Sequence, residues 1–242
     1  MIPVLMLLQP HIPTGVAVMK ACQELRKKIC ELGAQMIEVD QDKVDFDGSY
    51  VFCDGEEEEK RVSLEQIALK GTFFHNNIEL QVVKQHSSPI SPPPFMVGMA
   101  EVEVDTETGT VEVLDYVAAV DCGTPINPNL ARVQTEGGIA QGIGMALFEE
   151  VQYTEKGKVR NNSLMQYKIP TREDFGNIRV AFESSYEESG PFGAKSIGEL
   201  VIDTPCPAIA EAIYNATGVR VRELPITPEK VAMGILKKKL EK

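Results

Sequence analysis

GPFGAKSIGELVIDTPCPAIAEAIYNATG, residues 190–218, is the stretch from which the fold can be read. A loop punctuated by glycines leads into a helix, for which Asp203 or Thr204 can serve as N-cap and Gly218 as C-terminal stop. One acid, Glu199, stands at the mouth of that helix. Fixed backbone beside a glycine can present such an acid as a general base, although an acid in a loop is more often simply solvated. This stretch alone does not decide between the two interpretations.

The bulk composition narrows the class of protein. With 242 residues and 43% hydrophobic content, the chain can form one large domain or two small ones. A net charge of −12 argues against nucleic acid as a partner. Five cysteines without a CxxC pair favour reduced thiols in a cytoplasm over disulfides or a zinc site. The apolar opening, residues 1–10, is too short for a membrane span and lacks the features of a signal peptide.

Hydrophobic spacing predicts the elements of the first hundred residues. Apolar residues recur at helical spacing from Thr14 to Gly33, where glycine is a natural stop. Short alternating strands are predicted within residues 35–53. Ser63 and Gln66 have the spacing of a capping box, which predicts a short helix over residues 63–70.

The remaining strands are predicted from alternation. Residues 99–123 alternate most clearly and contain a glycine-bearing turn, which predicts a β-hairpin. Weaker strand patterns occur at residues 163–170, 178–184 and 219–224. A last helix is expected from Pro228.

Residues 127–150, NPNLARVQTEGGIAQGIGMALFEE, predict an unusual helix. Asn127 can cap it and Pro128 suits its first turn. Four glycines inside the helix cost roughly 3–4 kcal/mol relative to alanine, so something must offset them. Either small residues let two helices pack closely, or a ligand lies against bare backbone beside the Gln141 amide. The pattern matches neither a dinucleotide-binding nor a P-loop motif. The glycines are Gly137, Gly138, Gly142 and Gly144.

Several segments together resemble one known family. DCGTPINPNLARVQTEGGIAQGIGMALFEE, residues 121–150, resembles the aspartate-x-glycine, INP and glycine-rich helix segment of xanthine dehydrogenase and aldehyde oxidase family proteins. GPFGAKSIGEL, residues 190–200, resembles the G-x-K-x-x-GE motif of that family, and residues 207–231 resemble its C-terminal helix and tail. The resemblance runs in the family's order from about Thr14. It departs from the family at Leu200, where proline is common, which leaves the substrate subgroup open.

This resemblance implies a fold and a division of the chain. The fold would be α+β, with mixed or antiparallel sheets and packed helices, as in the second molybdopterin-binding domain of molybdenum hydroxylases. Residues 1–13 would be an atypical lead-in, and residues 14–242 the C-terminal molybdenum-cofactor-binding domain. Two α/β subdomains are expected, one of about residues 14–100 with C-terminal elements and one of about residues 101–200.

The resemblance also implies chemistry. The cofactor would be a molybdenum pyranopterin, with or without a nucleotide extension, whose metal takes no protein ligand. Glu199 would be the base toward the molybdenum-bound hydroxide in the hydroxylation of a purine, another N-heterocycle or an aldehyde. Gln141, Gly142 and Gly198 would contact the cofactor. Electrons would leave through iron–sulfur centres and FAD on partner domains or subunits.

The expected partners follow from the same resemblance. They are the upstream portion of the molybdenum subunit, the iron–sulfur and flavin subunits and a small substrate, in a cytoplasmic oligomer without nucleic acid or membrane. The chain alone is expected to be inactive. Two alternatives stay open: a non-catalytic remnant or assembly module of the same fold, and an unrelated hydrolase that pairs Glu199 with a second carboxylate.

Overall fold

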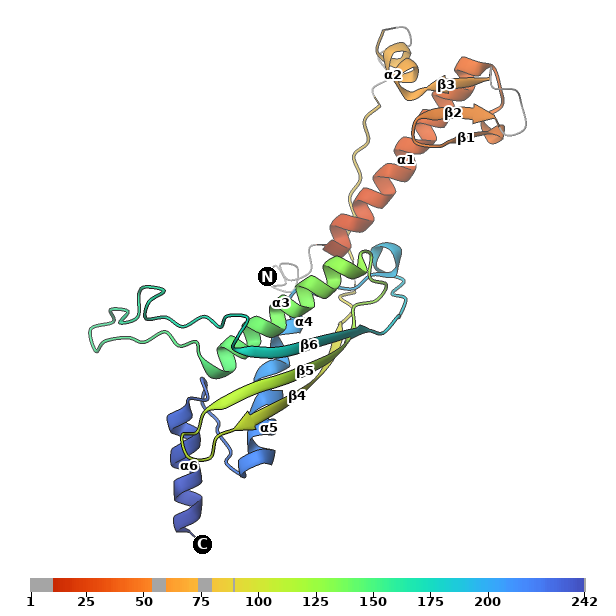
Figure 1. Ribbon diagram of the computed structural model, residues 1–242. Coiled ribbons are helices and arrows are strands. Elements are labelled where there is room, and N and C mark those ends of the chain that lie inside the picture. Colours follow the sequence, from red (N-terminus) through yellow and green to blue (C-terminus); the bar gives the residue numbers. More distant parts are fainter. Residues whose placement is uncertain (1–10, 54–59, 74–79, 89, 242) are drawn as a thin grey trace. The chain divides into compact units, whose positions relative to one another are not determined.

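The computed structural model describes residues 11–53, 60–73, 80–88 and 90–241 (Figure 1). The chain divides into two compact units, an N-terminal unit of residues 1–90 and a C-terminal unit of residues 91–242. Both stretches that the sequence singles out, residues 121–150 and 190–218, belong to the C-terminal unit. Within the described ranges, no helix has the length and apolar character that a bilayer crossing requires.

The N-terminal unit packs one long helix on a small antiparallel sheet with strand order β1-β2-β3. Ile29 and Leu32 of the helix are buried against Val51 of the sheet. A Cβ on Gly33 would come within 2.6 Å of Val51, so this glycine permits close packing inside the helix. The predicted stop at Gly33 is therefore wrong, and the helix continues to Ile37. The elements are α1 (His11–Ile37), η2 (Gln41–Lys43), β1 (Val44–Phe46), β2 (Tyr50–Cys53), β3 (Arg61–Ser63) and α2 (Leu64–Phe73).

The predicted capping box at the start of α2 is confirmed. The backbone N–H of Gln66 donates to Oγ of Ser63 at 3.2 Å. The N–H of Ser63 donates in return to Oε1 of Gln66 at 3.0 Å. Both N–H groups at this helix end are thereby satisfied, as this motif is expected to do.

The C-terminal unit is built on a mixed sheet. The predicted hairpin is confirmed, with β4 (Phe95–Val104) antiparallel to β5 (Val111–Asp121). In its turn, the Asp105 carboxylate accepts from the N–H of Glu107 at 2.8 Å, and Gly109 has a φ of +78°. The third strand, β6 (Phe175–Phe182), pairs parallel to β5, so the strand order is β4-β5-β6. The expected α+β class with mixed sheets is confirmed.

Helices cover one face of this sheet. The helix α5 packs along β4, and α3 contacts β6, α4 and α5 (Figure 1). Their apolar faces meet Tyr116 and Val120 of β5 in a single core. This arrangement brings the glycine-rich helix against the segment that follows Glu199. The elements are α3 (Pro128–Leu147), η3 (Pro191–Gly193), α4 (Leu200–Asp203), α5 (Pro205–Thr217) and α6 (Pro228–Leu240).

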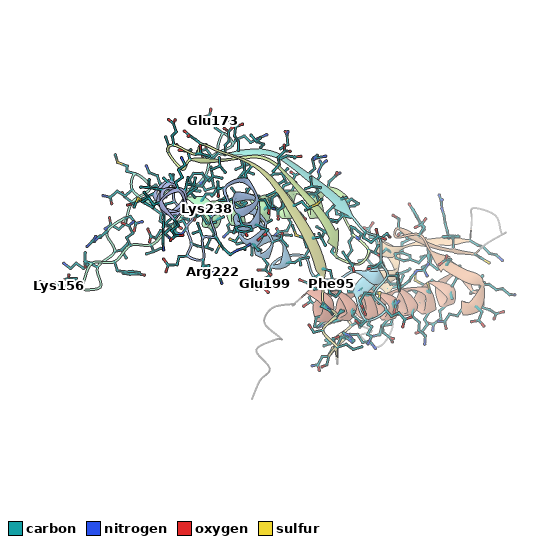
Figure 2. All side chains as sticks on the ribbon, turned by 90° about the horizontal axis from the view of Figure 1, so that it is seen from below. Phe95, Lys156, Glu173, Glu199, Arg222 and Lys238 are labelled. Carbon is teal, nitrogen blue, oxygen red and sulfur yellow. The ribbon has the colours of Figure 1, made fainter. Side chains whose placement is uncertain are left out.

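Two of the weaker strand predictions are wrong. Residues 163–170 lie in a long excursion between α3 and β6, which Figure 2 shows extending out to Lys156. Tyr167 is held there by a side-chain bond to Glu149 rather than by a neighbouring strand. Residues 219–224 connect α5 to α6 without strand structure, and Val219 packs instead against α6 at Gly234. In the first segment Leu164, Met165 and Ile169 remain exposed, so the apolar spacing there reflects no buried strand. Alternation alone cannot supply a partner strand.

Candidate active site

The glycine-rich helix α3 begins as predicted. Oδ1 of Asn127 accepts from the N–H of Leu130 at 3.1 Å, and Pro128 occupies the first turn. This cap fixes where the helix starts and therefore which of its residues face α4.

The glycines of α3 serve two different purposes. A Cβ on Gly138 would lie 2.2 Å from Val201, and a Cβ on Gly142 would lie 2.6 Å from Pro205. These two residues therefore allow α4 and the start of α5 to rest directly on α3. At Gly137, by contrast, no described atom lies within 4 Å of the place of a Cβ. The packing explanation is thus confirmed at Gly138 and Gly142. Gly137 leaves bare accessible backbone, and that a ligand lies against it stays a prediction.

The loop that leads to Glu199 is tied to the end of β5 by an ion pair. Nζ of Lys195 lies 2.6 Å from Oδ2 of Asp121, and their side chains are only 10% and 22% exposed. The other carboxylate oxygen accepts from the Ser185 hydroxyl at 2.6 Å and from the Gly123 N–H at 3.0 Å. Burial alone would raise the pKa of Asp121, but the lysine, the hydroxyl and the amide outweigh it and lower the pKa to about 2. Asp121 is therefore ionised at neutral pH.

Backbone contacts reinforce this pair. The N–H of Lys195 donates to the carbonyl of Cys122 at 2.7 Å, and the N–H of Thr124 donates to the carbonyl of Gly193 at 2.8 Å. Gly123 has a φ of +69°, and a Cβ there would lie 2.3 Å from the Gly193 carbonyl oxygen. Only glycine fits both this left-handed conformation and this close approach. The aspartate-x-glycine motif and the G-x-K motif are thus parts of one local structure.

A second attachment lies on the far side of Glu199. The hydroxyl of Tyr116, a fully buried residue of β5, donates to Oγ1 of Thr204 at 2.8 Å. Burial is the main reason that the pKa of Tyr116 is raised. Thr204 occupies the predicted N-cap position of α5, but its backbone is helical, with φ −82° and ψ −28°, and its side chain makes no cap hydrogen bond. The predicted C-terminal stop is confirmed, since Gly218 ends α5 with a φ of +72°.

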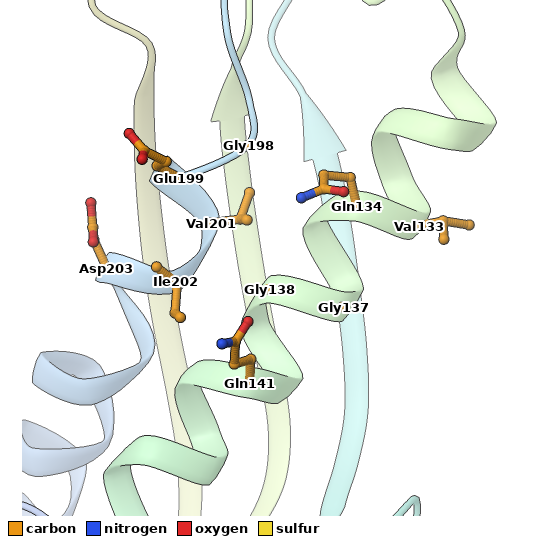
Figure 3. A pocket seen from close by; sticks show the side chains of 10 residues that line it. All are labelled: Val133, Gln134, Gly137, Gly138, Gln141, Gly198, Glu199, Val201, Ile202 and Asp203. Atoms are coloured by element: carbon orange, nitrogen blue, oxygen red, sulfur yellow. The ribbon is translucent and has the colours of Figure 1, made fainter. Parts of the chain in front are cut away.

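An open pocket of about 570 Å³ lies where α3 meets α4. Figure 3 shows the amides of Gln134 and Gln141 extending from α3 on the side of α4. Glu199, just before α4, and Asp203, at its end, stand at the rim with their carboxylates turned away from α3. The Glu199 side chain is exposed and has no hydrogen bond or ion pair to any residue that the structure describes. Its proton-accepting oxygens are free to meet a ligand. The lining residues are Val133, Gln134, Gly137, Gly138, Gln141, Gly198, Glu199, Val201, Ile202 and Asp203.

The structure brings together three of the four candidate residues. Gln141, Gly198 and Glu199 all line this pocket, although Gln141 is far in sequence from the other two. Gly142 does not line it, because it is buried beneath Pro205. The assignment of these residues to base and cofactor contacts stays a prediction.

The candidate residues named from the sequence leave out other residues of the pocket, among them Gln134 and Asp203. Gln134 lies two helical turns before Gln141, a spacing that places both on one face of α3 and could have identified it. Asp203 lies one turn after Glu199, but the short helix α4 that aligns them was not foreseen. Gly137 could not be told from its neighbour Gly138 without knowing which one faces α4.

A family model described as a molybdopterin cofactor-binding domain matches residues 12–176. The chain belongs to this family. Its curated relatives include the "probable hypoxanthine oxidase XdhD" of Escherichia coli K12, 35% identical over 93% of this chain and 23% of that protein. The xanthine dehydrogenase molybdenum-binding subunit of E. coli O157:H7 is 32% identical over 89% of this chain and 29% of that protein. The chain is thus a member of the molybdenum hydroxylases and spans about a quarter of these relatives' length.

Solved structures agree with the family. The quinoline 2-oxidoreductase of Pseudomonas putida 86 superposes with a TM-score of 0.74 and 26% identity, over 93% of this chain and 30% of that one. A Cu,Mo-CO dehydrogenase gives the same TM-score at 21% identity, over 95% of this chain and 29% of that one, which supports the fold alone.

The residues of the pocket fit a molybdopterin cofactor. A pterin presents a row of ring donors and acceptors, which an amide can match because it carries both kinds of group. Gln134 and Gln141 supply two amides on one helix face, and at Gly137 and Gly198 no described atom fills the place of a Cβ. In the described ranges, no group of three or more His, Cys, Asp or Glu side chains could hold a metal. That the metal takes no protein ligand stays a prediction.

Proposed function

We propose that this molybdopterin-binding oxidoreductase domain serves in the hydroxylation of a carbon in a purine, another N-heterocycle or an aldehyde, with Glu199 as the base. Relatives named hypoxanthine oxidase, nicotine 6-hydroxylase and aldehyde oxidoreductase cover these three substrate classes. The observation that carries the proposal is that Glu199, whose side chain has no hydrogen bond or ion pair with a described residue, shares one pocket with Gln141.

Each side chain of the pocket has a task in this proposal. When bound, the molybdenum cofactor supplies the activated oxygen and accepts two electrons from the substrate. Glu199 takes up a proton at a carboxylate oxygen, which makes the attacking oxygen more nucleophilic. The Gln141 amide orients the cofactor by hydrogen bonding, and the bare backbone at Gly198 lets it approach closely. Val201 and Ile202 supply the apolar part of the wall.

We also propose the partners that complete the enzyme. The relatives include a subunit gamma of a 6-hydroxypseudooxynicotine dehydrogenase complex and a large subunit of nicotine 6-hydroxylase. By analogy, this chain would assemble with the upstream portion of the molybdenum subunit and with iron–sulfur and FAD subunits into an oligomer. A cytoplasmic location is proposed because all five cysteines are free thiols. The cofactor would be molybdopterin or its dinucleotide form.

The decisive experiment is Glu199→Gln in the assembled enzyme. Because glutamine cannot accept the proton, turnover should fall at least about 100-fold while bound molybdenum is unchanged. Hypoxanthine, quinoline and benzaldehyde are the probe substrates, and the one that the wild type oxidises is used. Glu188→Gln, an exposed acid of the same loop, is the matched control and should retain activity. Undiminished turnover in Glu199→Gln would refute the assigned role.

The same preparation tests the two alternatives. A remnant or assembly module predicts a stable complex that contains no molybdenum by metal analysis. A hydrolase would need a second carboxylate near Glu199, and Asp203 does line the same pocket. We favour the hydroxylase because the matching family model is a molybdopterin cofactor-binding domain. Oxidation of a probe substrate without hydrolytic activity would support that choice.

A further inference from the structure

We propose that Lys195 is a positioning residue for Glu199: its ion pair with Asp121 fixes the loop at whose end the Glu199 carboxylate stands. The proposal rests on the proposed function in so far as Glu199 is the base. Lys195 touches neither substrate nor cofactor in this proposal and acts on Glu199 through the backbone between them.

The first argument is that the position of Glu199 depends on its backbone. Its carboxylate is exposed and has no hydrogen bond or ion pair within the described part of the chain. Its place must therefore be set by the attachments on either side. Downstream, Thr204 is bound to Tyr116 of β5. Upstream, Lys195 is bound to Asp121 at the end of the same strand.

The second argument is that the upstream attachment depends on charge. The Lys195 side chain is 10% exposed, so without a counterion its ammonium would be poorly solvated at this place. Asp121 meets it at 2.6 Å and is itself held by Ser185 and Gly123. The ammonium also lies 5.5 Å from the ring centroid of Phe95. The backbone bonds of Lys195 to Cys122 and of Thr124 to Gly193 remain without the charge, so loss of the ion pair should loosen the loop around Lys195 without detaching it.

The third argument is the proximity of the pair to the pocket. Only three residues separate Lys195 from Glu199. Gly198, the residue before Glu199, has open space around it and no packing of its own that would hold the chain. Between Lys195 and Glu199, Ser196 is buried and Ile197 packs against the core, so a backbone shift at Lys195 would reach Glu199 through this short, partly packed segment.

The first test measures hydrogen–deuterium exchange by mass spectrometry on this chain. In Lys195→Met, which removes the charge and keeps the stem, amides of residues 193–199 should exchange about tenfold faster than in the wild type. Lys195→Arg restores the charge and should exchange at nearly the wild-type rate. Lys156→Met, at the exposed tip of the excursion, is the matched control and should exchange like the wild type. Unchanged exchange in Lys195→Met overturns the proposal.

If Lys195→Met alone folds poorly, the double variant Asp121→Asn/Lys195→Met takes its place. It leaves no unpaired charge, and the asparagine amide can still accept from Ser185. Faster exchange confined to residues 193–199 supports the proposal, and wild-type exchange there overturns it.

The second test separates this proposal from that for Glu199. In the assembled enzyme, Lys195→Met should lower kcat about tenfold with KM and molybdenum content unchanged, and Lys195→Arg should recover most of it. Unchanged kcat in Lys195→Met overturns the positioning role. If Glu199→Gln stays active while Lys195→Met loosens the loop and lowers kcat, the base assignment fails and the loop positions another group.

Discussion

The Tyr116 hydroxyl lies 2.8 Å from Oγ1 of Thr204 and joins the centre of β5 to the junction of α4 and α5. Gly98 of β4 makes room for this bond, because a Cβ there would lie 2.0 Å from the hydroxyl. The strand that forms the middle of the sheet is thereby bonded to the point where α4 ends and α5 begins.

Tyr116→Phe tests that bond. The variant leaves the buried ring in place and removes only the hydroxyl, so the free energy of unfolding should fall by about 0.5–1.5 kcal/mol. Urea denaturation followed by circular dichroism measures it. Tyr153→Phe, whose side chain is 61% exposed, is the control and should unfold at the wild-type midpoint. A Tyr116→Phe midpoint equal to the wild type would show that the hydroxyl does not stabilise the junction.

Much of the fold could be predicted because it follows from local patterns. The hairpin of β4 and β5, the start of α3 at Asn127 and the end of α5 at Gly218 all depend on residues adjacent in sequence. The strand predicted at residues 219–224 failed because Val219 packs against α6, a contact that no local pattern reveals.

The site was predicted from motif resemblance, and its geometry was only partly foreseen. Gln141, Gly198 and Glu199 meet in one pocket as expected. The motif alone does not single out Lys195, since its ion-pair partner, Asp121, lies far back in the chain. Ion pairs between distant residues cannot be read from either segment alone.

The neighbouring glycines of α3 should respond in opposite directions to alanine. Gly137→Ala meets open space, so the better helix former should stabilise the chain by about 0.5–1 kcal/mol. Gly138→Ala places a methyl group 2.2 Å from Val201, and this overpacking should destabilise the chain by roughly 1–3 kcal/mol. Chemical denaturation of the two variants side by side is the measurement. Equal effects at both positions would contradict the division between packing and open glycines.

The Asp121 carboxylate should make stability depend on pH in an acidic window. Its pKa is lowered from 3.8 to about 2 in the folded chain. The folded state therefore binds the proton less tightly than the unfolded state, and the stabilisation is present above pH of about 4 and is lost between about 4 and 2. At neutral pH, the free energy of unfolding of Asp121→Asn should be lower than that of the wild type by roughly 1–3 kcal/mol. This range lies between the values typical of surface ion pairs and of buried ones.

The measurement is urea denaturation of both proteins from neutral pH down to about 2.5. The difference in unfolding free energy should shrink as the pH falls through the window, because protonated Asp121 no longer attracts Lys195. Asp203→Asn, at the exposed rim of the pocket, is the control for loss of a carboxylate and should show no such change across the window. A wild-type advantage over Asp121→Asn that stays constant across the window would rule out the ion pair as its source.

The side-chain amides of Gln134 and Gln141 on α3 should both contribute to cofactor binding. Gln134 and Gln141 lie two turns apart on one helix face, both in the wall of the pocket. If each makes one hydrogen bond to the pterin, Gln134→Ala and Gln141→Ala should each weaken cofactor binding by about five- to tenfold. Molybdenum and pterin content after dialysis of the assembled enzyme measures this, with Gln166→Ala in the exposed excursion as the matched control. Full cofactor content in Gln134→Ala would restrict the contact to Gln141, and full content in both variants would place the cofactor away from this face of α3.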